Sequence, residues 1–119
     1  MFGFRVGSIE LTVVSDGTMP LPAEALFPKG KRNEWESAIP RDANGQFVAG
    51  LNSLLVRTGN QTIVVDTGAS NKAGAPRRAP GELLDNLKSL GVEPGDVDLV
   101  ILTHGHWDHY GWNTREVNG

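Results

Sequence analysis

The chain has 119 residues, of which 39% are hydrophobic and 21% are charged, and its formal net charge is −3 at pH 7. This length suits about one small domain, and the composition excludes an intrinsically disordered chain. The acidic balance and scattered basic residues argue against nucleic-acid binding, and the lack of cysteine excludes disulfides, thiolate metal sites and cysteine nucleophiles.

Three apolar runs rich in Val, Leu, Ile and Thr predict β-strands. The first covers residues 8–14 and is expected to end in a turn at residues 15–18. The other two, residues 51–56 and 62–66, are separated by a short turn signal and predict a β-hairpin. Between residues 20 and 50, four prolines predict a long ordered loop with a short helix. This loop is either a lid or binding loop, or a surface excursion that caps the sheet.

A second loop at residues 71–80 leads to a predicted helix, with Pro80 in the first turn and Gly91 as the C-terminal cap. Leucines at helical spacing predict one buried face. These leucines are Leu83, Leu84, Leu87 and Leu90. The next apolar run, residues 97–102, predicts a strand buried on both faces that leads directly to His104.

All three histidines fall within six residues, in the order His-x-His-x-Asp-His. His104 and His106 are two apart where the chain leaves a strand, so both can bind one metal ion. Asp108 and His109 are adjacent in a starting helix, so they diverge and can reach a second ion. This sulfur-free set favours zinc and also suits manganese or iron. The alternative is a solvated turn whose histidines have no function.

The sequence THGHWDH at residues 103–109 resembles the signature of the metallo-β-lactamase superfamily. VVDTGA at 64–69 and NSLLV at 52–56 resemble two of its paired strands, and SDGT at 15–18 with LFP at 26–28 resembles a branch of organophosphate-hydrolase and lactonase-like members. The resemblance covers essentially the whole chain. It implies an α+β four-layer αβ/βα sandwich, of which this chain covers about the first half: the first sheet, one covering helix and the first metal loop.

The resemblance also implies roles for individual residues. His104 and His106 would hold the first metal, and Asp108 and His109 the second, with Asp108 also steering a proton as a catalytic residue. Asp66 matches a family aspartate that lies behind the ligands and orients the metal loop, which is how a carboxylate fixes the tautomer of a ligating histidine. The alternative for Asp66 is a plain turn carboxylate.

Two departures from the family pattern stand out. Tyr110-Gly111-Trp112 replaces an apolar residue and two glycines, so Trp107 and Trp112 become candidates for lining a pocket near the site. The family would also supply a third histidine for each metal, a bridging aspartate and a second sheet, none of which occurs by Gly119. We therefore expect residues 1–119 to be a partial domain with an uncovered apolar sheet face, prone to aggregate or needing a partner. Asp16 is expected to be a turn residue.

The resemblance implies a hydrolase in which two zinc ions, or manganese or iron, activate a water for attack on a small-molecule ester, lactone, amide or phosphoester. Substrate choice would lie partly in residues 20–50. One alternative is a non-catalytic fragment, or a split half that needs a complementing chain or a homo-oligomer. Another is an iron-dependent oxidoreductase similar to sulfur dioxygenases. No nucleic-acid or membrane partner is expected, and the cytoplasm is the expected location because no spanning or signal segment is apparent.

Overall fold

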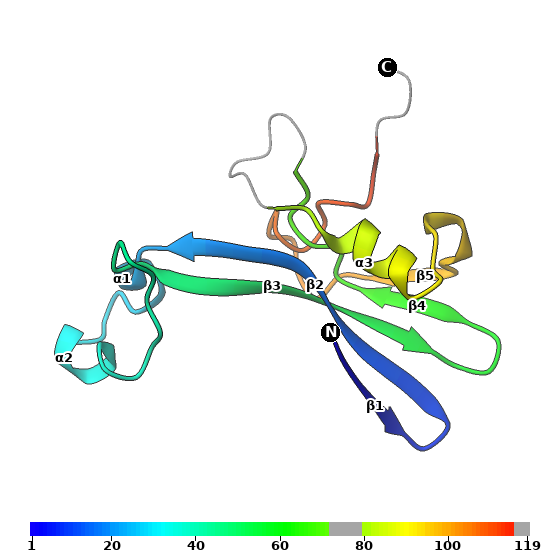
Figure 1. The fold of residues 1–119 in the computed structure, drawn as a ribbon, viewed down its shortest axis with the longest axis horizontal. Coiled ribbons are helices and arrows are strands. Elements are labelled where there is room, and N and C mark those ends of the chain that lie inside the picture. The colour runs from blue at the N-terminus through cyan, green and yellow to red at the C-terminus, as the bar shows by residue number, and fades with distance from the viewer. Residues whose placement is uncertain (72–79, 116–119) are drawn as a thin grey trace.

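The computed structural model describes residues 1–71 and 80–115, and its centre is one five-stranded sheet in the order β1-β2-β3-β4-β5 (Figure 1). The pairs β1–β2, β2–β3 and β3–β4 are antiparallel, and β5 runs parallel to β4. The strands are β1 Phe2–Val6, β2 Ile9–Leu21, β3 Phe47–Arg57, β4 Thr62–Val65 and β5 Leu99–Ile101. The sheet is therefore mixed, with its one parallel pair at the β5 edge.

The predicted hairpin is confirmed by the antiparallel pair of β3 and β4, whose register places Leu54 opposite Val65 and Arg57 opposite Thr62. β3 begins at Phe47, earlier than predicted, because it continues alongside the distal half of β2. β1 was not predicted. Phe2, Phe4 and Val6 alternate with Gly3 and Arg5, but the segment is short and all five residues are exposed, so pairing with β2 rather than burial defines this strand.

The turn predicted at residues 15–18 is wrong, because β2 continues through it to Leu21. The register with β3 shifts between Ser15 and Gly17, which leaves Asp16 as the extra residue of a β-bulge. A bulge accommodates one additional residue while the strand goes on, and it needs the same small and polar residue types that a turn uses. The sequence SDGT therefore gave the wrong local structure.

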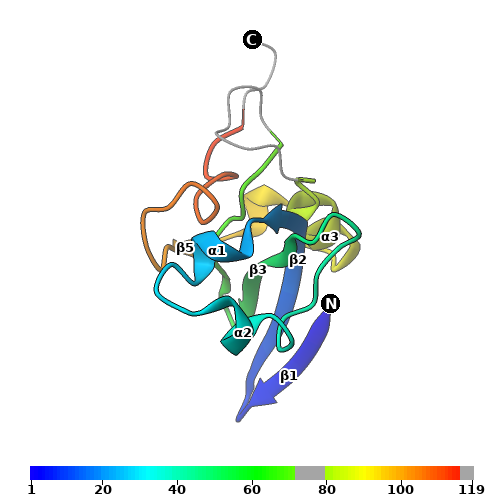
Figure 2. The ribbon, with the colours of Figure 1, turned by 90° about the vertical axis from the view of Figure 1, so that its left-hand side faces the viewer.

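Residues 22–46 form the end of the long arm made by β2 and β3, and they hold two short helices where one was predicted. These are α1, Ala23–Leu26, and α2, Arg32–Trp35. Phe27 stacks on Trp35 with ring centroids 5.7 Å apart. Both helices lie at the opposite end of the molecule from α3 (Figure 1), and Figure 2 views the molecule from this end.

The leucine-rich helix is confirmed as α3, Leu83–Ser89, and ends as predicted before Gly91, whose φ is 73°. It begins three residues after Pro80, so the proline precedes the first turn rather than occupying it. Leu83 and Leu87 are buried, and Leu84 and Leu90 are half-buried. A short 3-10 helix, η1 Pro94–Asp96, then leads to β5. Most of the predicted loop at 71–80 lies outside the described residues.

The main core lies between α3 and one face of the sheet. Its buried members are Val14, Leu55, Val64, Leu83, Leu87 and Val92. A second, smaller cluster lies further along the arm and joins Met19, Leu51 and Ala69. None of the helices in the described part of the chain has the length and apolar character to cross a membrane.

The opposite face of the sheet is apolar and incompletely covered. Paired residues in neighbouring strands share a face, so the register defines two apolar rows across all five strands. The rows are Phe2, Val13, Leu54, Val65 and Ile101, and Phe4, Leu11, Val56, Ile63 and Leu99. Each of these side chains is half-buried or exposed. We call this the open face.

The prediction that residues 97–102 form a strand buried on both faces is wrong. β5 covers only Leu99–Ile101, and Leu99, Val100 and Ile101 are 45%, 40% and 44% exposed. In the described structure β5 is the edge strand, so it has a neighbour on one side only. An apolar sequence indicates that a strand favours burial. Whether the strand is buried depends on the elements that pack against it.

We expect the purified 119-residue chain to self-associate through the open face, because contiguous apolar surface of this extent drives association. Replacing Leu99 and Ile101 together with lysine should weaken association at least about tenfold, since each side chain contributes on the order of 1 kcal/mol or more when buried. Val100→Lys is the matched control, because Val100 is similarly exposed on the other face of the same strand. Sedimentation velocity measures the effect, and equal weakening by the control would contradict it.

Candidate metal centre

The motif residues follow two parallel strands at one edge of the sheet. Asp66 comes directly after β4, and Thr103 comes two residues after β5. Because these strands are parallel, the chain leaves both of them at the same edge. The Asp66 N–H donates to the Ile101 carbonyl at 2.8 Å, which ties the two exits together. The histidine loop, residues 103–113, starts at this point.

The three imidazoles of the histidine loop lie against one another. Nε2 of His104 is 2.8 Å from Nδ1 of His106, and the ring centroids of this pair are 4.5 Å apart. The His104 and His109 centroids are 3.9 Å apart. His104 and His106 are exposed and His109 is half-buried. The structure therefore brings the predicted histidines together at an accessible edge of the sheet.

Asp66 lies behind these rings and is only 7% exposed. Its carboxylate accepts hydrogen bonds from the Thr103 N–H at 2.8 Å, the Thr103 hydroxyl at 2.7 Å and Nδ1 of His109 at 2.7 Å. Burial by itself raises the pKa of Asp66, but these hydrogen bonds outweigh it and hold the pKa below its ordinary value. Its φ of 57° is a conformation that aspartate tolerates better than most residues. Asp66 is thus hydrogen-bonded to both Thr103 and His109.

Asp108 is half-buried, and its Oδ2 lies 3.7 Å from Nε2 of His109. The helix predicted to start here is absent from the described residues. Positions 107–109 form a turn instead, in which the His109 N–H donates to the His106 carbonyl at 3.0 Å. In this turn the side chains of Asp108 and His109 end close together instead of diverging, so the carboxylate lies beside the imidazole.

The histidine loop is docked on residues 67–69 by backbone hydrogen bonds. The Thr67 N–H donates to the His109 carbonyl at 2.8 Å, and the Gly111 and Trp112 N–H groups donate to the Gly68 and Thr67 carbonyls at 2.7 and 3.1 Å. A Cβ on Gly111 would overlap the backbone of Ala69, so only glycine permits this approach. Residues 67–69 therefore hold the histidine loop in place.

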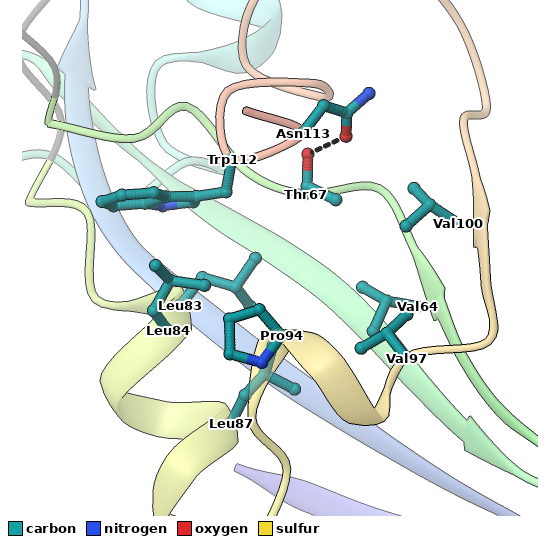
Figure 3. Close-up of a pocket in the computed structure, with 10 residues that line it drawn as sticks. All are labelled: Val64, Thr67, Leu83, Leu84, Leu87, Pro94, Val97, Val100, Trp112 and Asn113. Carbon is teal, nitrogen blue, oxygen red and sulfur yellow. Dashed lines mark hydrogen bonds between the residues drawn. The ribbon is translucent and has the colours of Figure 1, made fainter. Parts of the chain in front are cut away.

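The two tryptophans of the loop, which the sequence suggested as pocket residues, are both half-buried and pack against apolar core clusters. Trp107 packs against the cluster of Met19, Leu51 and Ala69. Trp112 packs against the α3 core and lies over Leu83 and Leu84 (Figure 3). It does line a cavity of about 180 Å³, but on the α3 side of the sheet. Indoles are large and apolar, so Trp107 anchors the middle of the loop and Trp112 its end to a core cluster.

Asp16, expected in a turn, is fully buried and is the site residue that the sequence analysis missed. Its Oδ2 accepts from the N–H groups of Ala69 and Ser70 at 2.8 and 3.2 Å. Its Oδ1 accepts from the Leu83 N–H at 2.9 Å and from the indole N–H of Trp112 at 3.0 Å. One carboxylate thus connects residues 69–70, the start of α3 at Leu83, and Trp112 of the histidine loop. The apolar residues on both sides of SDGT were the available sign that the strand continues through Asp16.

The donors at this edge fit a metal ion in kind. His104 and His106 turn ring nitrogens toward the same place, and His109 keeps Nε2 free of Asp66, next to the Asp108 carboxylate. Imidazole and carboxylate are the ligands that zinc takes in sites without sulfur. Across residues 1–71 and 80–115, no three such side chains are already arranged around one point.

Comparison with known proteins agrees with this geometry. The family model of the metallo-beta-lactamase superfamily matches residues 48–116, which contain all but the first residue of β3, together with β4, α3, β5 and the histidine loop. The chain belongs to the metallo-beta-lactamase superfamily. This confirms the family inferred from the sequence and the sandwich fold of which this chain covers about the first half.

Individual members of the metallo-beta-lactamase superfamily resemble the chain over most of its length. It is 35% identical to the rat metallo-beta-lactamase domain-containing protein 1 over 83% of this chain and 34% of that protein. Among solved structures, the dizinc quorum-quenching lactonase AidC has a TM-score of 0.77 at 28% identity, over 92% of this chain and 37% of that one. The hydrolase AbOPH gives 0.76 at 29%, over 91% and 37%. The chain thus spans about a third of the length of its curated relatives.

Proposed function

We propose that this chain carries part of the active site of a zinc-dependent hydrolase, and that residues 1–119 are part of a metallo-β-lactamase-like domain. The observation that carries the proposal is the meeting of His104, His106 and His109 at one sheet edge, with Asp66 hydrogen-bonded behind His109. Such a backing carboxylate is the usual support of a ligating histidine. The likeness to a dizinc lactonase and to another hydrolase supports the same reading.

In this proposal His104 and His106 bind one zinc ion, and Asp108 and His109 bind another. Bound zinc would supply a water of lowered pKa and a positive charge that stabilises a developing oxyanion. The chain's own part is positional. Asp66 directs Nδ1 of His109 inward and leaves its Nε2 for the metal, and the Asp108 carboxylate is placed beside that nitrogen, where it can also hold a proton.

The substrate is proposed to be a small molecule with an ester, lactone or phosphoester bond. Support comes from AidC, which is described as a quorum-quenching lactonase in complex with a product, and from the hydrolase AbOPH. We further propose that residues 20–50 contribute to substrate choice, and that a complementing segment, chain or second copy supplies further ligands. The cytoplasmic location stays a prediction.

Elemental analysis of the purified chain, with size-exclusion chromatography, tests the proposal. We expect zinc at about one ion or more per folded chain, since the motif supplies four donors of the kind that zinc prefers. Zinc confined to an oligomer would identify a second copy as the source of further ligands. Iron in place of zinc would favour the oxidoreductase alternative, and a folded chain that binds no metal would contradict the proposal. Hydrolysis of an aryl ester and a lactone is then assayed on the zinc-loaded fraction.

A further inference from the structure

The hydroxyl of Thr103 lies at the centre of the hydrogen bonds behind the histidines. Its Oγ1 is 2.7 Å from Oδ2 of Asp66, 3.1 Å from Nδ1 of His104 and 3.2 Å from Nδ1 of His109. We propose that Thr103 is a positioning residue that fixes His104 as the Nδ1–H tautomer and thereby leaves Nε2 of His104 as its metal-binding atom. The part of this inference that concerns metal rests on the proposed function.

The argument follows from the number of hydrogens available. A hydroxyl has one hydrogen to donate and two lone pairs that accept, and an ionised carboxylate only accepts. Asp66 already accepts the Thr103 N–H through Oδ1, and an aspartate carboxyl is ordinarily ionised at neutral pH, so the Thr103 hydrogen goes to Asp66. This is also the shortest of the three contacts, as expected of a bond to a charged acceptor. Toward His104, Oγ1 is therefore an acceptor only.

His104 must then donate from Nδ1 to use this contact. In the neutral ring the hydrogen on Nδ1 leaves Nε2 with a lone pair. That lone pair faces Nδ1 of His106 at 2.8 Å, so in the metal-free protein His106 donates its own Nδ1 hydrogen to His104. The chain of hydrogen bonds from Asp66 through Thr103 to His104 thus determines which nitrogen of His104 is directed outward.

His109 provides an internal comparison for this inference. Its Nδ1 is 2.7 Å from the Asp66 carboxylate and 3.2 Å from the Thr103 hydroxyl, so Asp66 alone can hold its hydrogen in place. The Nδ1 of His104, in contrast, is held by the Thr103 hydroxyl. Loss of that hydroxyl should release the tautomer of His104 and leave that of His109 unchanged.

Two variants separate the hydroxyl from the shape of the side chain. Thr103→Val keeps the branched shape and removes the hydroxyl. Thr103→Ser keeps the hydroxyl and loses a methyl group. Thr103 is exposed, and its N–H bond to Oδ1 of Asp66 is retained in both variants, so each is expected to fold.

Long-range proton–nitrogen NMR spectra of the chelator-treated chain with ¹⁵N-labelled histidine test the tautomers. The spectra are recorded at mildly alkaline pH, where the two tautomers of an uncharged imidazole are distinguished by which ring nitrogen carries the hydrogen. We expect His104 and His109 to be Nδ1–H tautomers in the native chain and in Thr103→Ser. In Thr103→Val, His104 should become a mixture of tautomers while His109 does not change. A native His104 protonated on Nε2, or a His104 unaffected in Thr103→Val, would overturn the inference.

Zinc titration against a chelating indicator measures the consequence for metal binding. We expect affinity to fall about tenfold in Thr103→Val, within the range found for residues that orient a ligand, and to be restored in Thr103→Ser. Equal affinity in native and Thr103→Val would overturn the assignment of Thr103 as a positioning residue for the metal. If the native chain binds no zinc, the proposed function fails, and the NMR result still decides the tautomer inference by itself.

Discussion

Replacing Asp16 with alanine is expected to lower the free energy of unfolding by roughly 3–5 kcal/mol, the largest effect on stability that we expect from a single change here. Among the described residues, the substitution removes the acceptor of the N–H groups of Ala69, Ser70 and Leu83, and of the indole N–H of Trp112. Asp16 is fully buried, so water cannot replace the carboxylate without opening the structure.

Urea denaturation followed by circular dichroism measures this effect. Asp16→Asn should also destabilise the chain, because its amide group presents hydrogens where the carboxylate accepts on both oxygens. Asp85→Ala is the control, since Asp85 is exposed on α3, and it should change stability by less than about 0.5 kcal/mol. If Asp16→Ala and Asp85→Ala unfold at the same urea concentration, the Asp16 carboxylate does not hold the loop, the strand and the helix together.

The role of Asp16 could not be predicted because its partners are distant in the sequence. The donors in the described part of the chain lie 53, 54, 67 and 96 residues further along the sequence. Locally, Ser-Asp-Gly-Thr has the composition of a turn, and only pairing with β3 shows that it is a bulge within a longer strand. The cost of burying a carboxylate is met entirely by contacts that no short window of sequence contains.

The elements that were predicted correctly are those whose evidence is local. The β3–β4 hairpin combines two apolar runs with a short turn, and α3 combines leucines at helical spacing with Gly91 at its end. β5 was predicted as a strand for the same reason, but its burial was not, because burial depends on neighbouring elements. The apolar residues of β5 and of the open face would suit a covering layer, and residues 1–71 and 80–115 do not provide one.

For the candidate site, the residue pattern predicted which side chains could bind metal, and the structure shows which residues surround them. The compact spacing of His104, His106, Asp108 and His109 could be read directly, and the structure places these side chains at one sheet edge. The contacts of Trp107 and Trp112 could not be read from the sequence, because an aromatic residue beside a ligand can face either the substrate or the core. The position of the Thr103 hydroxyl among Asp66, His104 and His109 could not be predicted from the sequence and is seen only in the structure.

Replacing His106 and Asp108 together with alanine is expected to abolish zinc binding. In the proposed arrangement this removes one ligand from each metal, and each remaining histidine would hold its ion alone, which is too few ligands for a stable zinc site. The chain has no other histidine that could substitute. We expect zinc content to fall from at least about one ion per chain to less than roughly a tenth of that value by elemental analysis.

Folding and metal binding are separated by measuring stability with and without zinc. At a free zinc concentration about 100 times the dissociation constant, a ligand specific for the native state stabilises it by about 2.7 kcal/mol. The native chain and Tyr110→Ala, which alters an exposed residue of the same loop, should both gain this stability. The double variant should unfold like the zinc-free native chain whether or not zinc is added. If it gains as much stability as the native chain, zinc binds elsewhere, and His106 and Asp108 are not its ligands.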